Sequence, residues 1–63
     1  MISNTLKEVR TQKSVTQEDL AVAVGVSRQT IISIEKGKYT PSVLLALNIA
    51  SFFKVKVEDI FIV

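Results

Sequence analysis

The chain has 63 residues, which is close to the lower limit for a domain that must build its own hydrophobic core. It contains no cysteine and no histidine, which excludes disulfide frameworks, cysteine-based zinc sites and catalysis by a histidine base. The net charge of +2 is small for a protein that binds a polyanion, so the position of the basic residues matters more than their number.

The first predicted helix follows a short N-terminal segment. Leu6 and Val9 recur at the spacing of one helical face, which predicts a helix over about residues 4–13. At the other end of the chain, residues 61–63 are too apolar for a free tail. Residues 2–3 and 61–63 can pair as a small antiparallel ribbon, which is one way to bury both ends.

The second predicted helix carries a start signal and a stop signal. Thr16 is a good N-cap, and Asp19 stands three residues later, where its carboxylate can complete a capping box. Gly25 ends the helix, because glycine adopts the left-handed backbone of a helix C-terminus at little cost. The inward-facing stripe of this helix consists of Leu20, Ala21 and Val24.

The third predicted helix begins after the cap Ser27, runs to about Lys36 and stops at Gly37. At 100° per residue, Ile31 and Ile34 point together into the core. The opposite side of the helix carries side chains that can reach DNA, namely Arg28, Gln29, Ile32 and Ser33.

These outward side chains suit the major groove of duplex DNA. Arginine can pair with guanine O6 and N7, and glutamine with adenine N6 and N7. Ile32 can touch a thymine methyl group, and Ser33 can reach a base or a phosphate. Gln17 and Thr30 stand at helix N-termini, where free N–H groups favour phosphate oxygens. The pattern predicts a DNA-reading helix-turn-helix, although an ordinary helical hairpin with a polar face would share these residues.

The fourth predicted helix opens at Pro41-Ser42 and ends near Phe53, and residues 57–60 form at most a short fifth helix. A sufficient inward face consists of Val43, Ala46, Leu47, Ala50 and Phe53. Further apolar residues surround the rest of the helix, namely Leu44, Leu45, Ile49 and Phe52. A helix that is apolar almost all round is usually buried on more than one side.

Two explanations account for this surplus apolar surface. Scattered apolar side chains are common on proteins and need no partner. The other explanation is a homodimer interface, for which we predict Leu44, Leu45, Phe52, Ile60 and Phe61. Phe52, Ile60 and Phe61 can equally complete the core of one chain. A twofold dimer would place two reading helices about 34–36 Å apart, which is one turn of DNA.

The combined spacing resembles the Cro/phage-repressor-type helix-turn-helix family, also called the XRE family. Gln17, Ala21 and Gly25 recur every four residues, followed by Ile31 and by the Glu35-x-Gly37 pair. The segments SRQTI, IEKGKYTPS and VEDIF, at 27–31, 34–42 and 57–61, resemble small stand-alone members, the cytolysin repressor among them. The likeness spans nearly the whole chain. It implies one all-α domain over residues 1–63, a compact bundle of four to five short helices.

The resemblance also implies roles for individual residues. The residues that match Arg28, Gln29 and Ser33 face bases in the family, and the one that matches Gln17 holds a phosphate. Arg10 and Glu35 match a buried ion pair whose role is structural. The loop after the reading helix touches the DNA backbone in family members and holds Lys36, Lys38, Tyr39 and Thr40; simple solvation of that loop is the alternative.

Some positions depart from the family pattern. Val22 and Ile32 stand where charged or amide side chains are typical, and Leu44 and Leu45 stand where polar residues are common. A protein-interaction module, such as an antitoxin or anti-repressor, could use Val22, Leu44 and Leu45 to bind another protein.

The sequence therefore predicts a dimeric transcriptional regulator, a repressor that covers a palindromic operator in double-stranded DNA. No nucleophile–base pair or metal cluster can be assembled from these residues, so we expect no enzyme, no metal, no cofactor and no small-molecule ligand. No run of about 20 apolar residues and no secretion signal is present, so we expect a cytoplasmic protein without membrane contact.

Overall fold

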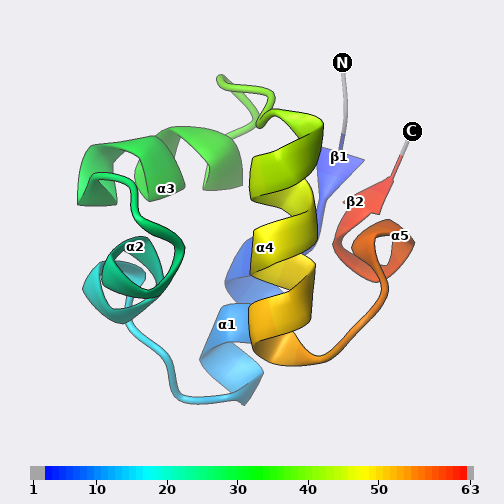
Figure 1. Ribbon diagram of the computed structural model, residues 1–63, viewed down its shortest axis with the longest axis horizontal. Helices are drawn as coiled ribbons and strands as arrows, with labels where there is room; N and C mark the ends of the chain where they lie inside the picture. Colours follow the sequence, from blue (N-terminus) through cyan, green and yellow to red (C-terminus); the bar gives the residue numbers. More distant parts are fainter. Residues whose placement is uncertain (1–2, 63) are drawn as a thin grey trace.

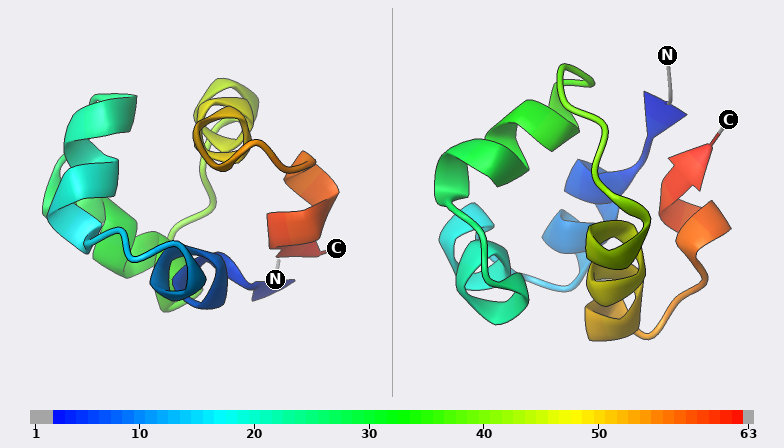
Figure 2. Two further views of the ribbon diagram at one scale, coloured as in Figure 1. Left: turned by 90° about the horizontal axis from the view of Figure 1, so that it is seen from below. Right: turned by 45° about the horizontal axis from the view of Figure 1, so that its top comes forward.

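A computed structural model describes residues 3–62 of the chain, which form five helices and a two-stranded ribbon (Figure 1). The α2–α3 pair lies on one side of the molecule, and α5 lies with the ribbon on the other side (Figures 1 and 2). Between them, α1 and α4 cross the middle of the molecule. In chain order the elements are β1 (Ser3–Asn4), α1 (Leu6–Gln12), α2 (Gln17–Val24), α3 (Arg28–Glu35), α4 (Val43–Phe53), α5 (Val57–Ile60) and β2 (Phe61–Ile62).

The ribbon joins the two ends of the chain. β1 pairs antiparallel with β2, with Ser3 opposite Ile62 and Asn4 opposite Phe61. The Thr5 amide extends the pairing by donating a hydrogen bond to the Ile60 carbonyl at 2.8 Å. The predicted bundle with a terminal ribbon is confirmed. Ile2 and Val63, which we also placed in the ribbon, lie outside the described residues.

The helix boundaries follow the capping residues. Thr16 Oγ1 accepts a hydrogen bond from the Asp19 amide at 3.0 Å, and the Thr16 amide donates to Asp19 Oδ2 at 3.3 Å, so the capping box is complete. Gly25 then has the left-handed backbone, with φ of 77°. Both predictions are confirmed. Ser27 and Ser42 cap α3 and α4 in the same way, by accepting from the amide three residues later.

Helix α1 is shorter than the predicted range 4–13, because Asn4 belongs to β1 and serves as a tie instead. Asn4 Oδ1 accepts a hydrogen bond from the Leu6 amide at 3.2 Å. Its Nδ2 donates to the Ile34 carbonyl on α3 at 2.9 Å. A single amide side chain therefore fixes the start of α1 against α3.

The core contains one buried cluster contributed by α1 to α5. Its members are Leu6, Leu20, Ala21, Ile31, Ile34, Leu45, Ile49, Ala50, Phe53 and Ile60. The inward positions predicted for α3 are confirmed, since Ile31 and Ile34 are both fully buried. Among residues 3–62, no helix is long and apolar enough to cross a membrane.

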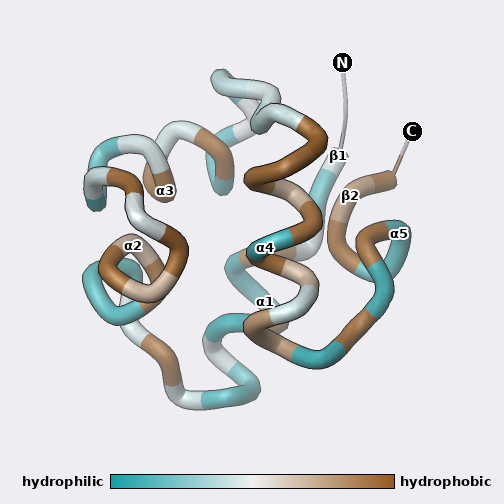
Figure 3. The backbone as a smooth tube through the Cα atoms, viewed as in Figure 1, coloured by the Kyte–Doolittle hydropathy of each residue, from teal (hydrophilic) through white to brown (hydrophobic). Residues whose placement is uncertain are grey.

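The predicted inward face of α4 was wrong in part. Ala50 and Phe53 are buried, but Val43 is 78% exposed and Leu47 is 50% exposed. The buried stripe instead runs through Leu45, Ile49 and Phe53, at every fourth position. Figure 3 shows the reason, because hydrophobic residues occur along most of α4 and on more than one side of it. Hydrophobic periodicity therefore could not identify the side that packs on the other helices.

Candidate nucleic-acid interface

The inner side of helix α3 packs into the core, and its outer side faces solvent. Ile31 and Ile34 anchor it in the core with no exposed surface. Arg28 and Gln29, at its first two positions, are exposed. Ile32 and Ser33, one turn further on, are half-buried. The four side chains predicted to read bases thus differ in reach, and the first two extend furthest into solvent.

The turn between α2 and α3 sets how the outer side of α3 is presented. After the left-handed Gly25, the Val26 amide donates a hydrogen bond to the Ala21 carbonyl at 3.0 Å. The Ser27 hydroxyl caps α3 and lies 3.0 Å from the Thr30 hydroxyl. Thr30 is half-buried near the N-terminus of α3, and its hydroxyl is hydrogen-bonded to that of Ser27.

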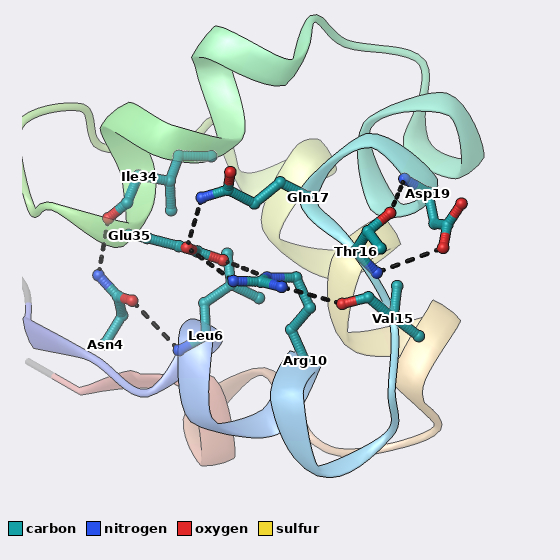
Figure 4. Close-up of polar contacts among 9 residues, drawn as sticks. All are labelled: Asn4, Leu6, Arg10, Val15, Thr16, Gln17, Asp19, Ile34 and Glu35. Carbon is teal, nitrogen blue, oxygen red and sulfur yellow. Dashed lines mark hydrogen bonds and ion pairs between the residues drawn. The ribbon is translucent and has the colours of Figure 1, made fainter.

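Arg10 and Glu35 form a largely buried ion pair (Figure 4). Arg10 Nε donates to Glu35 Oε2 at 2.7 Å, and Nη2 donates to Oε1 at 3.3 Å. Arg10 Nη1 also donates to the Val15 carbonyl at 2.9 Å. The side chains are only 13% and 5% exposed. This is the pair that the family resemblance implied, and it ties α1 and the following loop to the last turn of α3.

Gln17 joins this pair, which the sequence reasoning missed. Gln17 is the first residue of α2, and its Nε2 donates to Glu35 Oε1 at 3.1 Å. The two residues are 18 positions apart, so no helical spacing links them. The packing of α2 against α3 brings them together. The family roles of the two residues, a phosphate contact and an ion pair with Arg10, do not imply this hydrogen bond.

A hollow of about 740 Å³ lies beside this network. Gln17 and Arg28 both line it, so one predicted phosphate contact and one predicted base contact meet on the same surface. The remaining lining residues come from α1, the loop after it and the start of α2, and are Arg10, Thr11, Ser14, Val15, Thr16 and Glu18.

The loop after α3 presents the remaining candidates for phosphate contact. Gly37 has the left-handed backbone, with φ of 74°, and turns the chain away from the helix. The Lys38 amide donates back to the Ser33 carbonyl at 2.9 Å, which fixes the start of the loop. The loop carries four exposed side chains that can contact a phosphate, namely Lys36, Lys38, Tyr39 and Thr40.

The five residues that we predicted for a dimer interface differ in how far they are exposed. Leu45 is 9% exposed and Ile60 is fully buried, so both belong to the core of one chain and their assignment to an interface was wrong. Leu45 is equally unavailable to a different protein partner. Leu44 is 68% exposed and Phe52 is 42% exposed, with Phe52 packed edge-on against Phe53 at 5.0 Å between ring centroids. Phe61 is half-buried.

An apolar groove of about 230 Å³ runs between α4 and the C-terminal elements. Its lining residues are Thr40, Pro41, Val43, Ala46, Leu47, Val57 and Phe61. The groove was missed because Val43 and Leu47 were assigned to the core. Leu44 lies next to Val43 and about one helical turn before Leu47, and all three side chains are exposed. The exposed apolar surface therefore continues from the groove across α4.

Comparisons with known proteins agree with this fold. A family model described as helix-turn-helix matches residues 6–60. An uncharacterised HTH-type transcriptional regulator of Methanocaldococcus jannaschii is 64% identical over 61 residues, which are 97% of this chain and 92% of that protein. A transcriptional repressor of the cryptic phage CTXphi from Vibrio cholerae is 27% identical, over 95% of this chain and 54% of the repressor. The crystal structure of a proposed DNA-binding protein from Bacteroides fragilis superposes with a TM-score of 0.88, at 28% identity, over 97% of this chain and 98% of that one.

Proposed function

Since the chain belongs to the helix-turn-helix family, we propose that it regulates transcription by binding a specific sequence in duplex DNA. The observation that supports this proposal is the division of α3 into a buried apolar side and an exposed polar N-terminal end. Two fully buried isoleucines fix the helix, while Arg28 and Gln29 extend from its first turn into solvent. A rigid helix with exposed polar residues at its N-terminal end is the arrangement that reads base edges in the major groove.

Base reading is divided among four side chains. Arg28 and Gln29 are long, exposed and able to make bidentate hydrogen bonds with a purine. Ser33 is shorter and half-buried, so it reaches only a base or phosphate that comes close to the helix. Ile32 offers an apolar contact for a thymine methyl group. Specificity therefore depends mainly on Arg28 and Gln29.

Phosphate contacts on both sides of α3 would fix its register in the groove. Gln17 approaches from the start of α2, and Thr30 lies at the start of α3 itself. From the other end of the helix, Lys36, Lys38, Tyr39 and Thr40 form an exposed loop. The two lysines also supply charge that releases counterions from DNA, which compensates for the small net charge of the chain.

We place the homodimer contact on the α4–β2 face, which we define as Val43, Leu44, Leu47 and Phe61. Val43, Leu44 and Leu47 are 78%, 68% and 50% exposed, and Phe61 lines the adjoining groove. Contiguous exposed apolar residues of this kind mark interaction sites more often than isolated ones. This assignment no longer includes Leu45 and Ile60, because both lie in the core. It also leaves out Phe52, which lies on another side of α4.

Repression would act through occupancy of a palindromic operator in the cytoplasm. A twofold dimer presents two copies of α3 to half-sites about one turn, or 34–36 Å, apart. A dimer bound at that site excludes other proteins from it without any chemical step. Similarity to a phage transcriptional repressor supports this direction of control.

In vitro selection from a random duplex pool at near-physiological salt tests the proposal. We expect enrichment of a palindrome whose half-sites lie about one helical turn apart. Enrichment of a single half-site would retain the DNA function and remove the dimer. Failure to enrich any sequence would contradict the proposal and favour a protein partner on the exposed apolar residues Val22 and Leu44.

A further inference from the structure

One carboxylate receives hydrogen bonds from two other helices. Glu35, at the end of α3, accepts from Arg10 of α1 through both of its oxygens, at 2.7 and 3.3 Å. Its Oε1 also accepts from Gln17 Nε2 of α2 at 3.1 Å. The Glu35 side chain is only 5% exposed, whereas Gln17 lines the surface hollow beside it. Gln17 therefore extends from the largely buried ion pair to the same hollow that Arg10 lines.

We propose that Glu35 is a positioning residue for DNA binding, in addition to its structural pairing with Arg10. It orients the amide of Gln17 so that the second N–H of Nε2 is available to a phosphate of the DNA backbone. This inference rests on the proposed function, because it assigns a partner to Gln17 only when the chain binds DNA.

The chemistry of the three groups makes this orientation selective. A glutamine amide can be turned so that either its oxygen or its nitrogen faces a neighbour, and a phosphate accepts hydrogen bonds only from the nitrogen. An ionised carboxylate is an acceptor only, so Glu35 selects the nitrogen of Gln17. Figure 4 shows the nitrogen of Gln17 directed at Glu35 and the oxygen directed away from it. Among residues 3–62, the second N–H of that nitrogen has no other acceptor.

The ion pair also makes a carboxylate acceptable at this place. An unpaired negative charge so close to a phosphate site would repel DNA. Arg10 lies 2.7 Å from Glu35 and occupies both of its oxygens, so the pair adds no net charge beneath Gln17. An amide that is already held in its bound orientation loses less side-chain freedom when it meets the phosphate. Arg10 and Glu35 thereby contribute to DNA affinity without touching DNA.

The test compares the effect of Gln17→Ala on operator affinity in two backgrounds of the full chain. One is the wild type, and the other combines Arg10→Met with Glu35→Met, which removes the acceptor of Gln17 without leaving a buried charge unpaired. In the wild type, Gln17→Ala should weaken binding to the selected operator about five- to tenfold. In the Met background, the same change should cost less than about twofold. Circular dichroism verifies folding before each titration.

Lys38→Ala is the matched control, because Lys38 lies in the exposed loop after α3 and its amide donates a hydrogen bond to the Ser33 carbonyl. Its effect on affinity should be the same in both backgrounds. A merely structural ion pair predicts that Gln17→Ala, too, costs the same in both. Equal costs for Gln17→Ala, or no cost in the wild type, would overturn the inference. A wild-type chain that selects no duplex would overturn the proposed function itself, and this inference with it.

Side-chain NMR relaxation of the wild type provides a second test that does not depend on any variant folding. The Gln17 amide should be nearly as rigid as the backbone, whereas the exposed Gln29 amide should be mobile. Equal mobility of the two amides in free protein would contradict the positioning role of Glu35.

Discussion

Helices α3 and α4 both bury one stripe of aliphatic residues, but their other sides differ. The outer side of α3 carries Arg28 and Gln29, which water solvates well. The outer side of α4 carries Val43 and Leu44, which are 78% and 68% exposed. A polar side suits a partner that offers hydrogen-bonding groups, and an apolar side gains stability only when it is covered. This difference is the basis of our proposal that α3 binds DNA and that α4 packs against a second copy of the chain.

The largest expected effect concerns the anchoring of α3 rather than its outer side. Glu35→Ala leaves Arg10, 13% exposed, without its partner, and should lower the free energy of unfolding by about 3–5 kcal/mol. Urea unfolding followed by circular dichroism measures this change. The matched control is Glu18→Ala, an exposed carboxylate that should change stability by less than about 0.5 kcal/mol. Similar effects of the two changes would contradict the structural role of the pair.

Adjacent leucines on α4 test which side of that helix is inside. Leu45→Ala should lower the free energy of unfolding by about 2–5 kcal/mol, because Leu45 is 9% exposed. Leu44→Ala should leave the unfolding of the single chain nearly unchanged and should weaken the dimer in analytical ultracentrifugation. If Leu44→Ala destabilised the single chain as much as Leu45→Ala, the assignment of the buried stripe would be wrong.

The outer side of α3 is tested by Gln29→Ala. Loss of one bidentate contact should reduce discrimination at one base position of each half-site by about 1–3 kcal/mol, with little change in binding to random duplex. Competition binding with operators changed one position at a time measures this. An equal loss of affinity for operator and random duplex would show that Gln29 contacts no base.

The smallest effect is expected from Lys38→Ala, because it removes a contact that carries no sequence information. Affinity should fall alike for operator and random duplex. The slope of log K against log salt concentration should become shallower by about 0.9 per protomer. Titrations at three or more salt concentrations determine the slope, and an unchanged slope would mean that Lys38 is merely solvated.

The contrast between α3 and α4 also explains what the sequence could predict. In α3, Ile31 and Ile34 stand three positions apart, and apart from Ile32 the other residues are polar, so the periodicity identified the inner side correctly. In α4, all residues except Asn48 and Ser51 are apolar, so several stripes fitted equally well and the wrong one was preferred in part. The helix ends were predictable because capping is local, as Thr16 and Ser27 illustrate.

The groups that the sequence could not connect lie at helix junctions. Gln17 and Glu35 meet because α2 and α3 cross at a particular angle, which depends on packing of the whole core rather than on any local spacing. The groove at Val43 and Phe61 depends in the same way on where α5 and β2 settle against α4. The inward positions of α3 could be predicted from their spacing, and the Arg10–Glu35 pair from the family resemblance, whereas the Gln17–Glu35 hydrogen bond and the groove required the structure.

The most direct test of the account is amide chemical-shift mapping of the labelled chain with its selected operator duplex. The account predicts that the largest DNA-dependent changes fall on residues 28–33 and 36–40, together with the start of α2. The α4 residues of the α4–β2 face, Val43, Leu44 and Leu47, form a stripe that should change little when operator is added to an already dimeric protein. Changes confined to that stripe, with α3 unaffected, would contradict the assignment of α3 as the helix that reads DNA.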